Sequence, residues 1–314
     1  MTTQLNTTER ADRTGVSFAG VQSRRALRVA WISLAWTLVA LFFLGGMLLL
    51  AVRYVAMPRA DEFRPRIEQM ASRALQTPVT IGRIEASWRG FNPHLALTAV
   101  SVAGSEGHPG LSLPRVEGTV SWLSALALAP RFAVLRIEAP DLDVIRLTGN
   151  RFSIAGFIVD PDQKGEDSGA SDWILVQGEV VVRDARVRYS DRRIPSVATE
   201  LELTNVNLQL ENVFGSHLFG LQAQPTSAMA GPIDLRARFR HAPFSRPSDY
   251  ARWTGEVFGA VDYADLAALA RTFDAPFKVE RAQGAVRSWV TFDQARVTRV
   301  IADVALTNVN VTLA

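Results

Sequence analysis

The longest apolar run in the chain lies near its N-terminus, where residues 29–52 carry no charged side chain. As a helix this run would measure roughly 36 Å at about 1.5 Å per residue, enough to cross a hydrocarbon core of about 30 Å. The apolar core of a cleaved signal peptide has only about 7–15 residues. We therefore predict a retained single transmembrane helix over 29–52, preceded by a short, disordered cytoplasmic tail over 1–28.

Basic and aromatic residues flank the apolar run on both sides, as expected at membrane interfaces. Tryptophan and tyrosine favour the membrane–water boundary, and arginine can contact anionic lipid head groups. Slightly more arginines precede the run than follow it, which favours a cytoplasmic N-terminus with the bulk of the chain on the other side. The predicted interface residues are Arg24, Arg25, Arg28, Trp31, Trp36, Arg53 and Tyr54.

The segment 53–77 predicts a juxtamembrane amphipathic helix over residues 61–76. Phe63, Ile67 and Met70 recur at helical spacing, Pro65 lies in the first turn, and Pro78 ends the pattern. Two interpretations stay open: a collar on the membrane surface, or a helix that caps the end of a sheet.

From residue 78 onward the pattern changes to strict alternation of apolar and polar residues. Alternation with a period of two indicates antiparallel strands with one apolar and one polar face. A phase slip at Thr204 and Asn205 predicts a bulge or tight turn. Helices are expected only at 121–129 and 263–273. Strands are predicted at 80–87, 134–138, 142–146, 184–189, 201–203, 206–210, 233–239, 284–292 and 302–306.

Charge and cysteine content narrow the class of protein. The chain has 34 Lys and Arg against 31 Asp and Glu, a net charge of +3, and no cysteine. The excess lies entirely in residues 1–28, so the remainder is balanced and shows no nucleic-acid footprint. The absence of cysteine excludes disulfides, thiolate metal sites and a cysteine nucleophile.

No constellation in the sequence points to catalysis, a metal or a cofactor, so an enzyme is not expected. The four histidines (His94, His108, His217 and His241) are isolated, and we expect them at the surface or in turns. Asp141 and Asp143 share a strand face and are interpreted as solvated. The polar segment 160–172 is interpreted as a mobile surface loop.

A short motif recurs along the chain. Leu203–Asn207 and Leu306–Asn310 are identical, and Leu97–Ser101 is a looser copy at a similar interval, which hints at a larger repeating unit. The sequence stops within an apparent strand, so we expect it to be part of a longer protein.

The order of several loose β motifs after the apolar run resembles the AsmA-like superfamily, and in particular its long YhdP-type members. These motifs are Thr80–Pro93, Val116–Trp122, Leu135–Leu142, Arg151–Gly156, Trp173–Leu175, Val182–Tyr189 and Leu203–Val206. The resemblance implies an inner-membrane anchor and a periplasmic, elongated, incurled antiparallel β-sheet over residues 78–314. It also implies a lipid-accessible groove of the bridge-like lipid-transfer type, without catalytic residues.

A curled sheet with one apolar face could shield acyl chains from water, since each exposed CH₂ costs about 0.8 kcal/mol. The candidates to line such a groove are Ala185, Val187, Tyr189, Leu235, Ala237 and Phe239. The alternative is that these residues pack as an ordinary core on the helix expected at 263–273. We expect phospholipid acyl chains and the inner membrane as partners, with outer-membrane components reached by a further part of the protein. The alternative function is a non-enzymatic scaffold for outer-membrane assembly.

Overall fold

The computed structural model describes residues 19–75, 77–104, 110–122, 124, 131–147, 151–155, 157–159, 168–191, 200–243, 245–247, 249–268 and 278–312. The chain divides into two compact units, Met1–Pro58 and Arg59–Ala314.

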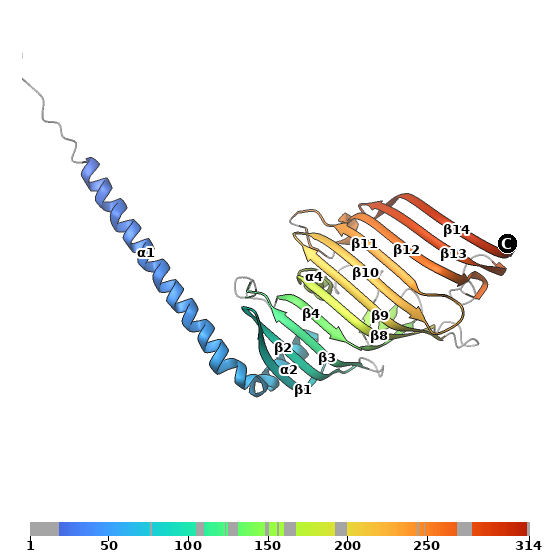
Figure 1. Cartoon of the computed structure of the whole chain (residues 1–314), viewed down its shortest axis with the longest axis horizontal. Helices are drawn as coiled ribbons and strands as arrows, with labels where there is room; N and C mark the ends of the chain where they lie inside the picture. The colour runs from blue at the N-terminus through green and yellow to red at the C-terminus, as the bar shows by residue number, and fades with distance from the viewer. Residues whose placement is uncertain are drawn as a thin grey trace, which may run out of the picture. The chain divides into compact units, whose positions relative to one another are not determined.

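The N-terminal unit is one long helix, α1 (Ala19–Ala51), continued by the short π-helical turn η1 (Val52–Ala56) (Figure 1). Residues Arg28–Val55 are long and apolar enough to cross a membrane, and none of the apolar window is buried against protein. Ser33 and Thr37 donate their hydroxyl hydrogens to carbonyls one turn earlier, at 2.8 Å each, which satisfies these polar groups within the helix.

The helix begins earlier than predicted, since residues 19–28 of the expected disordered tail are helical. Alanine, glutamine, leucine and arginine in this segment are good helix formers, and extending an existing helix costs little compared with nucleating one. Residues 1–18 lie outside the described part.

Helix α2 (Arg64–Leu75) follows the 3₁₀ segment η2 (Met57–Phe63) and packs on the first strands of the sheet. Ile67 and Ala71 contact the apolar cluster of those strands. Glu68 Oε1 accepts a hydrogen bond from the Ile81 N–H at 2.7 Å, and Arg64 Nη1 donates to the Gly82 carbonyl at 2.7 Å. These contacts confirm the sheet-covering interpretation of this helix; the membrane collar stays a prediction.

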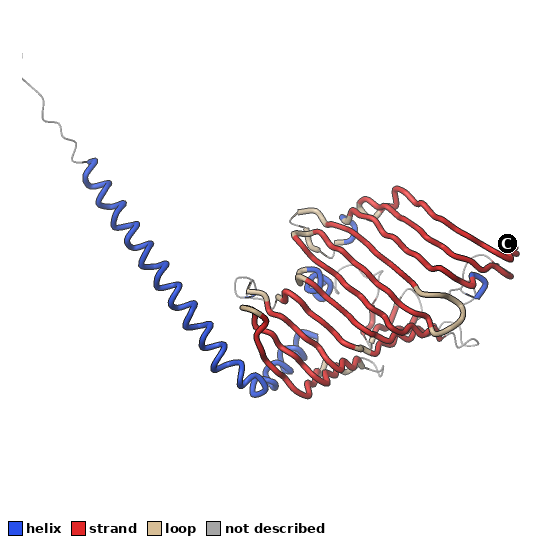
Figure 2. Tube along the Cα trace, viewed as in Figure 1, coloured by secondary structure: helices blue, strands red, loops and turns tan. Residues whose placement is uncertain are grey.

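The second unit is built on one 14-stranded sheet (Figure 2). From β8 onward the strands follow chain order to the edge strand β14, each pairing antiparallel with the next. The strands are β1 (Val79–Arg89), β2 (Asn92–Val102), β3 (Leu111–Val120), β4 (Phe132–Glu138), β5 (Asp141–Arg146), β6 (Phe152–Ile154), β7 (Phe157–Val159), β8 (Glu179–Asp191), β9 (Glu200–Val213), β10 (Ser216–Pro225), β11 (Ile233–Arg240), β12 (Thr254–Asp265), β13 (Lys278–Asp293) and β14 (Arg296–Thr312). The predicted mainly β fold with an antiparallel sheet is confirmed, and the sheet is antiparallel except where β8 pairs with β4 and β5.

Three local predictions need correction. Strand β8 pairs in parallel with both β4 and β5, whereas the alternating pattern predicts antiparallel strands. The alternation within one strand does not show which strands become its neighbours. Residues 263–265 of the helix predicted at 263–273 end strand β12 instead, whereas 266–268 are helical as predicted and 269–273 lie outside the described residues. The end of the predicted loop 160–172 forms helix α4 (Ser168–Leu175), because Trp173 and Leu175 can bury their apolar side chains against the sheet. Most of the helix expected at 121–129 also lies outside the described residues.

The three copies of the recurring motif share one backbone feature, a residue with positive φ. Ala99, Asn205 and Asn308, each the third residue of its copy, have positive φ values of 54°, 48° and 55°. Registers slip beside Asn205, where β8 and β10 pair with β9, as expected for β-bulges. The extra residue lets Leu203 and Val206, three positions apart, face the same side of the sheet, and both belong to one apolar cluster. The predicted phase slip at Thr204 and Asn205 is confirmed.

Candidate functional site

One face of the sheet, here called the inner face, is apolar from strand to strand. The register places one inner-face residue of each strand from β8 to β14 in a single row: Val180, Leu210, Phe219, Ala237, Val257, Val290 and Val300. The adjacent row on the other side, the outer face, is mixed and consists of Val181, Gln209, Gly220, Arg236, Phe258, Trp289 and Ile301. Seven strands at about 4.8 Å spacing make the inner face roughly 30 Å wide over this part of the sheet.

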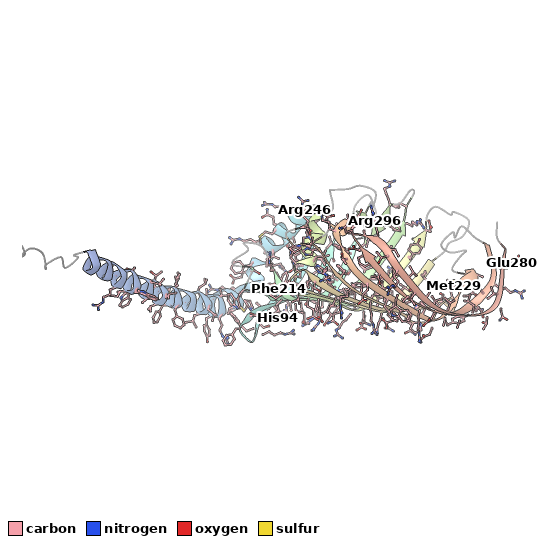
Figure 3. The ribbon with its side chains drawn as sticks, turned by 90° about the horizontal axis from the view of Figure 1, so that it is seen from above. His94, Phe214, Met229, Arg246, Glu280 and Arg296 are labelled. Carbon is pink, nitrogen blue, oxygen red and sulfur yellow. The ribbon has the colours of Figure 1, made fainter. Side chains whose placement is uncertain are left out.

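The strands bow around the inner face. Figure 3 shows Glu280 and Arg296, near the two ends of the β13–β14 hairpin, on the same side of the curved sheet, and His94 on the opposite side. The sheet is therefore incurled, as predicted. Because His94 belongs to the outer face and lies on the convex side, the apolar inner face is the concave one.

All six candidate lining residues lie on the inner face. Ala185, Val187 and Tyr189 follow one another on β8, paired with Val206, Leu203 and Leu201 of β9. Leu235, Ala237 and Phe239 do the same on β11, paired with Leu221, Phe219 and His217 of β10. Their role in lipid contact stays a prediction.

Packing differs among these six residues. Ala185 is 1% exposed, and the Phe239 ring stacks on His217 and Trp253 with centroid distances of 4.9 and 4.3 Å. Val187 and Leu235 are half-buried. Phe239 is therefore enclosed by its own neighbours, whereas Val187 and Leu235 keep part of their apolar surface accessible.

Two helices cover part of the inner face. Helix α2 covers β1–β3, and α4 places Trp173 edge-to-face on Phe132 at 6.2 Å, beside Leu135, Val180 and Leu210. Farther along the sheet, the cluster of Ala185, Val206 and Ala223 contacts only residues of neighbouring strands among those described. On β14, Val300 and Val304 are 61% and 52% exposed. A sheet normally buries its apolar face under a second layer. Within the described part of the chain, no helix residue belongs to the Ala185 cluster, and the apolar side chains of β14 stay accessible.

His217 is buried at the end of the inner face, which corrects the expectation of a surface histidine. It is 1% exposed, and its Nδ1 lies 2.5 Å from Asn212 Oδ1. Burial, with a smaller contribution from His241, lowers the pKa of His217 to about 4, so the ring is neutral near pH 7. His217 packs as a neutral aromatic side chain. The alternation along β10 indicates which side of the sheet His217 lies on, but its burial depends on Phe239 of the neighbouring strand β11.

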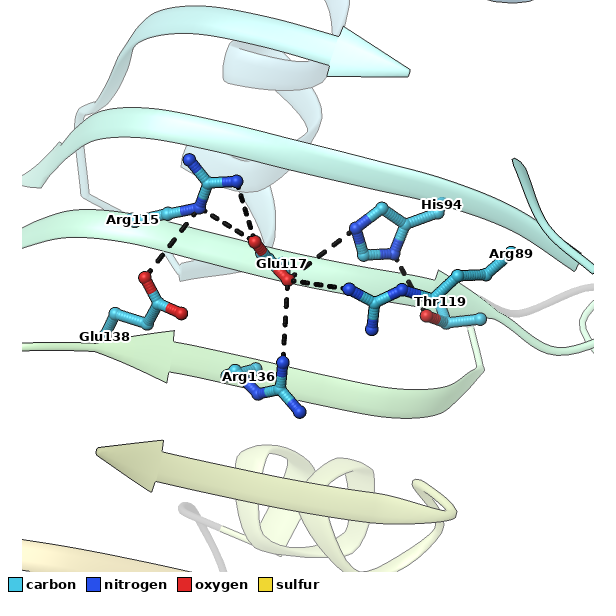
Figure 4. Close-up of polar contacts among 7 residues, drawn as sticks. All are labelled: Arg89, His94, Arg115, Glu117, Thr119, Arg136 and Glu138. Atoms are coloured by element: carbon cyan, nitrogen blue, oxygen red, sulfur yellow. Dashed lines mark hydrogen bonds and ion pairs between the residues drawn. The ribbon is translucent and has the colours of Figure 1, made fainter. Parts of the chain in front are cut away.

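A second buried polar cluster lies on the outer face of β1–β4, around Glu117 (Figure 4). Arg115, Arg89 and Arg136 approach its carboxylate at 2.8, 3.4 and 3.8 Å. Burial acts to raise the pKa of Glu117, but the hydrogen bond and charge of Arg115, together with the charges of His94 and Arg89, outweigh it, and the net pKa is lowered. The cluster ties four strands together through one carboxylate.

His94 belongs to this cluster and is buried, a second correction to the expected surface histidines. Its Nδ1 lies 3.0 Å from Thr119 Oγ1, and its pKa is lowered by burial and by Arg89. His108 lies outside the described residues, and His241 is half-buried beside Ser245.

No metal-binding cluster emerges in the part of the chain that the structure describes. Within it, no group of three or more histidine or carboxylate side chains could hold a metal ion. Asp141 and Asp143 both pair with Arg188, at 2.9 and 2.7 Å, on a partly exposed strand face, as the interpretation of a solvated pair requires.

Together these features define a class: a protein with an N-terminal helix of membrane-spanning character and a large, mostly antiparallel sheet with one apolar face. Residues 21–314 match the YhdP family, described as YhdP protein, and the chain belongs to that family. Membership indicates a membrane-associated protein related to lipid transport, of a family not known as enzymes. No curated protein matches the chain, and no solved structure does.

Proposed function

We propose that the chain is a segment of a passive lipid conduit, anchored in the inner membrane with its sheet in the periplasm. Phospholipid acyl chains lie on the inner face and move along it toward the outer membrane. The N-terminus is cytoplasmic, and Arg24, Arg25, Arg28, Trp31, Trp36, Arg53 and Tyr54 contact the membrane interfaces.

The observation that carries the proposal is the row from Val180 to Val300, which is apolar in every strand, whereas the outer row is interrupted by Gln209 and Arg236. Each CH₂ exposed to water costs about 0.8 kcal/mol, so an acyl chain gains by lying on such a surface. An acyl chain spans one leaflet, about half of the roughly 30 Å hydrocarbon core. Strands β10–β14, beyond the two strands whose row residues pack against α4, are roughly 20 Å wide at about 4.8 Å spacing, which accommodates that length.

The test compares two adjacent positions on β8 that face opposite sides. A photo-crosslinking amino acid replaces Val187, on the inner face, or Arg188, on the outer face, in the full chain in membranes. We expect phospholipid adducts from position 187 and far fewer from position 188. Adducts to protein only from position 187 would refute the proposal.

A further inference from the structure

The outer face carries a broad depression that the proposed lipid path does not use. It encloses about 1130 Å³ over strands β8–β13. We call it the outer depression and define it by Gly220, Gln222, Arg236, Arg238, Phe258 and Trp289, all of which line it. This volume is slightly above the roughly 300–1,000 Å³ of typical ligand pockets, and the depression is open to solvent.

Gly220 forms the floor of the outer depression, in the middle of β10. A Cβ added there would meet nothing within 4 Å, and the residue does not have positive φ. Several other strand glycines have packing reasons: a Cβ at Gly118 would meet the Phe132 ring at 2.6 Å, and one at Gly255 would meet Arg238 O at 2.3 Å. A glycine inside a strand weakens it and often marks close approach by a ligand. Gly220 thus leaves space that the fold itself does not require.

An aromatic pair forms one wall of the outer depression. In the register, Gly220 faces Arg236, followed across the sheet by Phe258 and Trp289. The two rings lie 5.2 Å apart at 45°, and Trp289 is 40% exposed. An exposed indole on a face of mixed polar and apolar residues offers a flat apolar platform with a hydrogen-bond donor at its edge.

Hydrogen-bonding groups surround this platform. Asp234 holds Arg236 in place with a contact of 2.7 Å to Nη2 and one of 3.1 Å to Nε. Among the described residues, Gln222, Arg238 and Glu256 make no side-chain hydrogen bond or ion pair, so an amide, a guanidinium and a carboxylate remain available to a ligand. Charged lining residues number three arginines (Arg183, Arg236, Arg238) and four carboxylates (Asp184, Glu211, Asp234, Glu256), a formal sum of −1.

From this arrangement we infer that the outer depression binds a neutral oligosaccharide of pyranose rings. A pyranose ring has an apolar C–H face that fits an indole and a rim of hydroxyls that fits mixed donors and acceptors. The near-balanced charge disfavours a polyanion. An extended peptide would pair with a strand edge, and the backbone groups on this face are already used in the sheet. An acyl chain would need a continuous apolar surface, which the charged surroundings of Phe258 and Trp289 interrupt.

The test measures binding of a hexamer of β-1,4-linked N-acetylglucosamine to the full chain by calorimetry. The chain is held in phospholipid nanodiscs, because detergents with sugar head groups would compete. Gly220→Phe fills the space without a backbone clash, and Trp289→Ala removes the platform. Trp122→Ala is the matched control, since Trp122 is 45% exposed in the turn after β3 and does not line the outer depression.

We expect the wild type and the Trp122→Ala variant to bind alike, and the two depression variants to bind at least about tenfold more weakly. All variants should keep the wild-type thermal midpoint; if Gly220→Phe does not, Trp289→Ala with Gln222→Ala replaces it. No binding by the wild type at about 1 mM hexamer, equal binding by all variants, or preference for a sulfated hexamer would overturn the inference. Crosslinking of phospholipid at position 187 is independent of the outer depression, so failure of one proposal leaves the other testable.

Discussion

Placing a charge on the inner face is the sharpest perturbation of the proposed lipid path. Leu221 lies on the inner face of β10, paired with Leu208 and Leu235, while its neighbour Gln222 is exposed on the outer face. An aspartate in the middle of hydrocarbon costs about 2.5–3.5 kcal/mol. Since each 1.4 kcal/mol is a factor of ten, Leu221→Asp should weaken phospholipid binding by about 100-fold. Gln222→Asp should leave it within about twofold.

The assay measures transfer of a fluorescent phospholipid from vesicles to the purified full chain. Val304→Asp is the second inner-face variant: Val304 is 52% exposed, so the charge disturbs folding little and its effect on lipid remains interpretable. Equal lipid binding by the wild type, Leu221→Asp and Val304→Asp would refute the assignment of the inner face. Loss of binding in Gln222→Asp alone would do the same.

Three further predictions concern the fold. Glu117→Gln should lower the free energy of unfolding by about 1–3 kcal/mol at pH 7. Because the folded pKa of Glu117 is lowered, its stabilisation is complete above the unfolded pKa and is lost as pH falls through the folded pKa. Equal urea midpoints of the wild type and Glu117→Gln at pH 7 would contradict this. His217, with a folded pKa of about 4 against 6.5, should make the wild type lose up to about 3 kcal/mol as pH falls from 6.5 to 4, and His217→Phe should flatten that slope in acid unfolding curves. Persistence of the slope in the variant would show that other groups cause it. Asn205→Val should cost about 1–2 kcal/mol, because its φ of 48° disfavours β-branched residues, whereas Asn205→Gly should be tolerated; equal thermal midpoints would exclude a strained bulge.

Alternation along the chain predicts most of the sheet because each strand has one apolar and one polar face. The prediction is strongest where the pattern is strict, as in β8 and β11, and both strands place their candidate residues on the inner face. Even the bulge at Asn205 is visible as a change of phase. These features are local, so a single strand carries enough information.

Features that depend on pairing between distant segments are not visible in this way. The parallel pairing of β8 with β4 and β5 requires knowing which strands meet. The burial of His217 comes from Phe239 on the neighbouring strand. The outer depression needs the register that places Gly220 in one row with Phe258 and Trp289. In sequence, the only sign of it is a glycine at a polar-face position of an alternating strand.

The most direct test of the central claim uses the absence of cysteine in the chain. Leu235→Cys and Arg236→Cys each provide one thiol, on the inner and outer faces of the same strand, for an environment-sensitive fluorophore. Phospholipid brominated along its acyl chains is then added to the labelled full chain. A lipid-bearing inner face predicts quenching and a blue shift at position 235 and neither at position 236. Equal quenching at the two positions, or none at position 235, would contradict it.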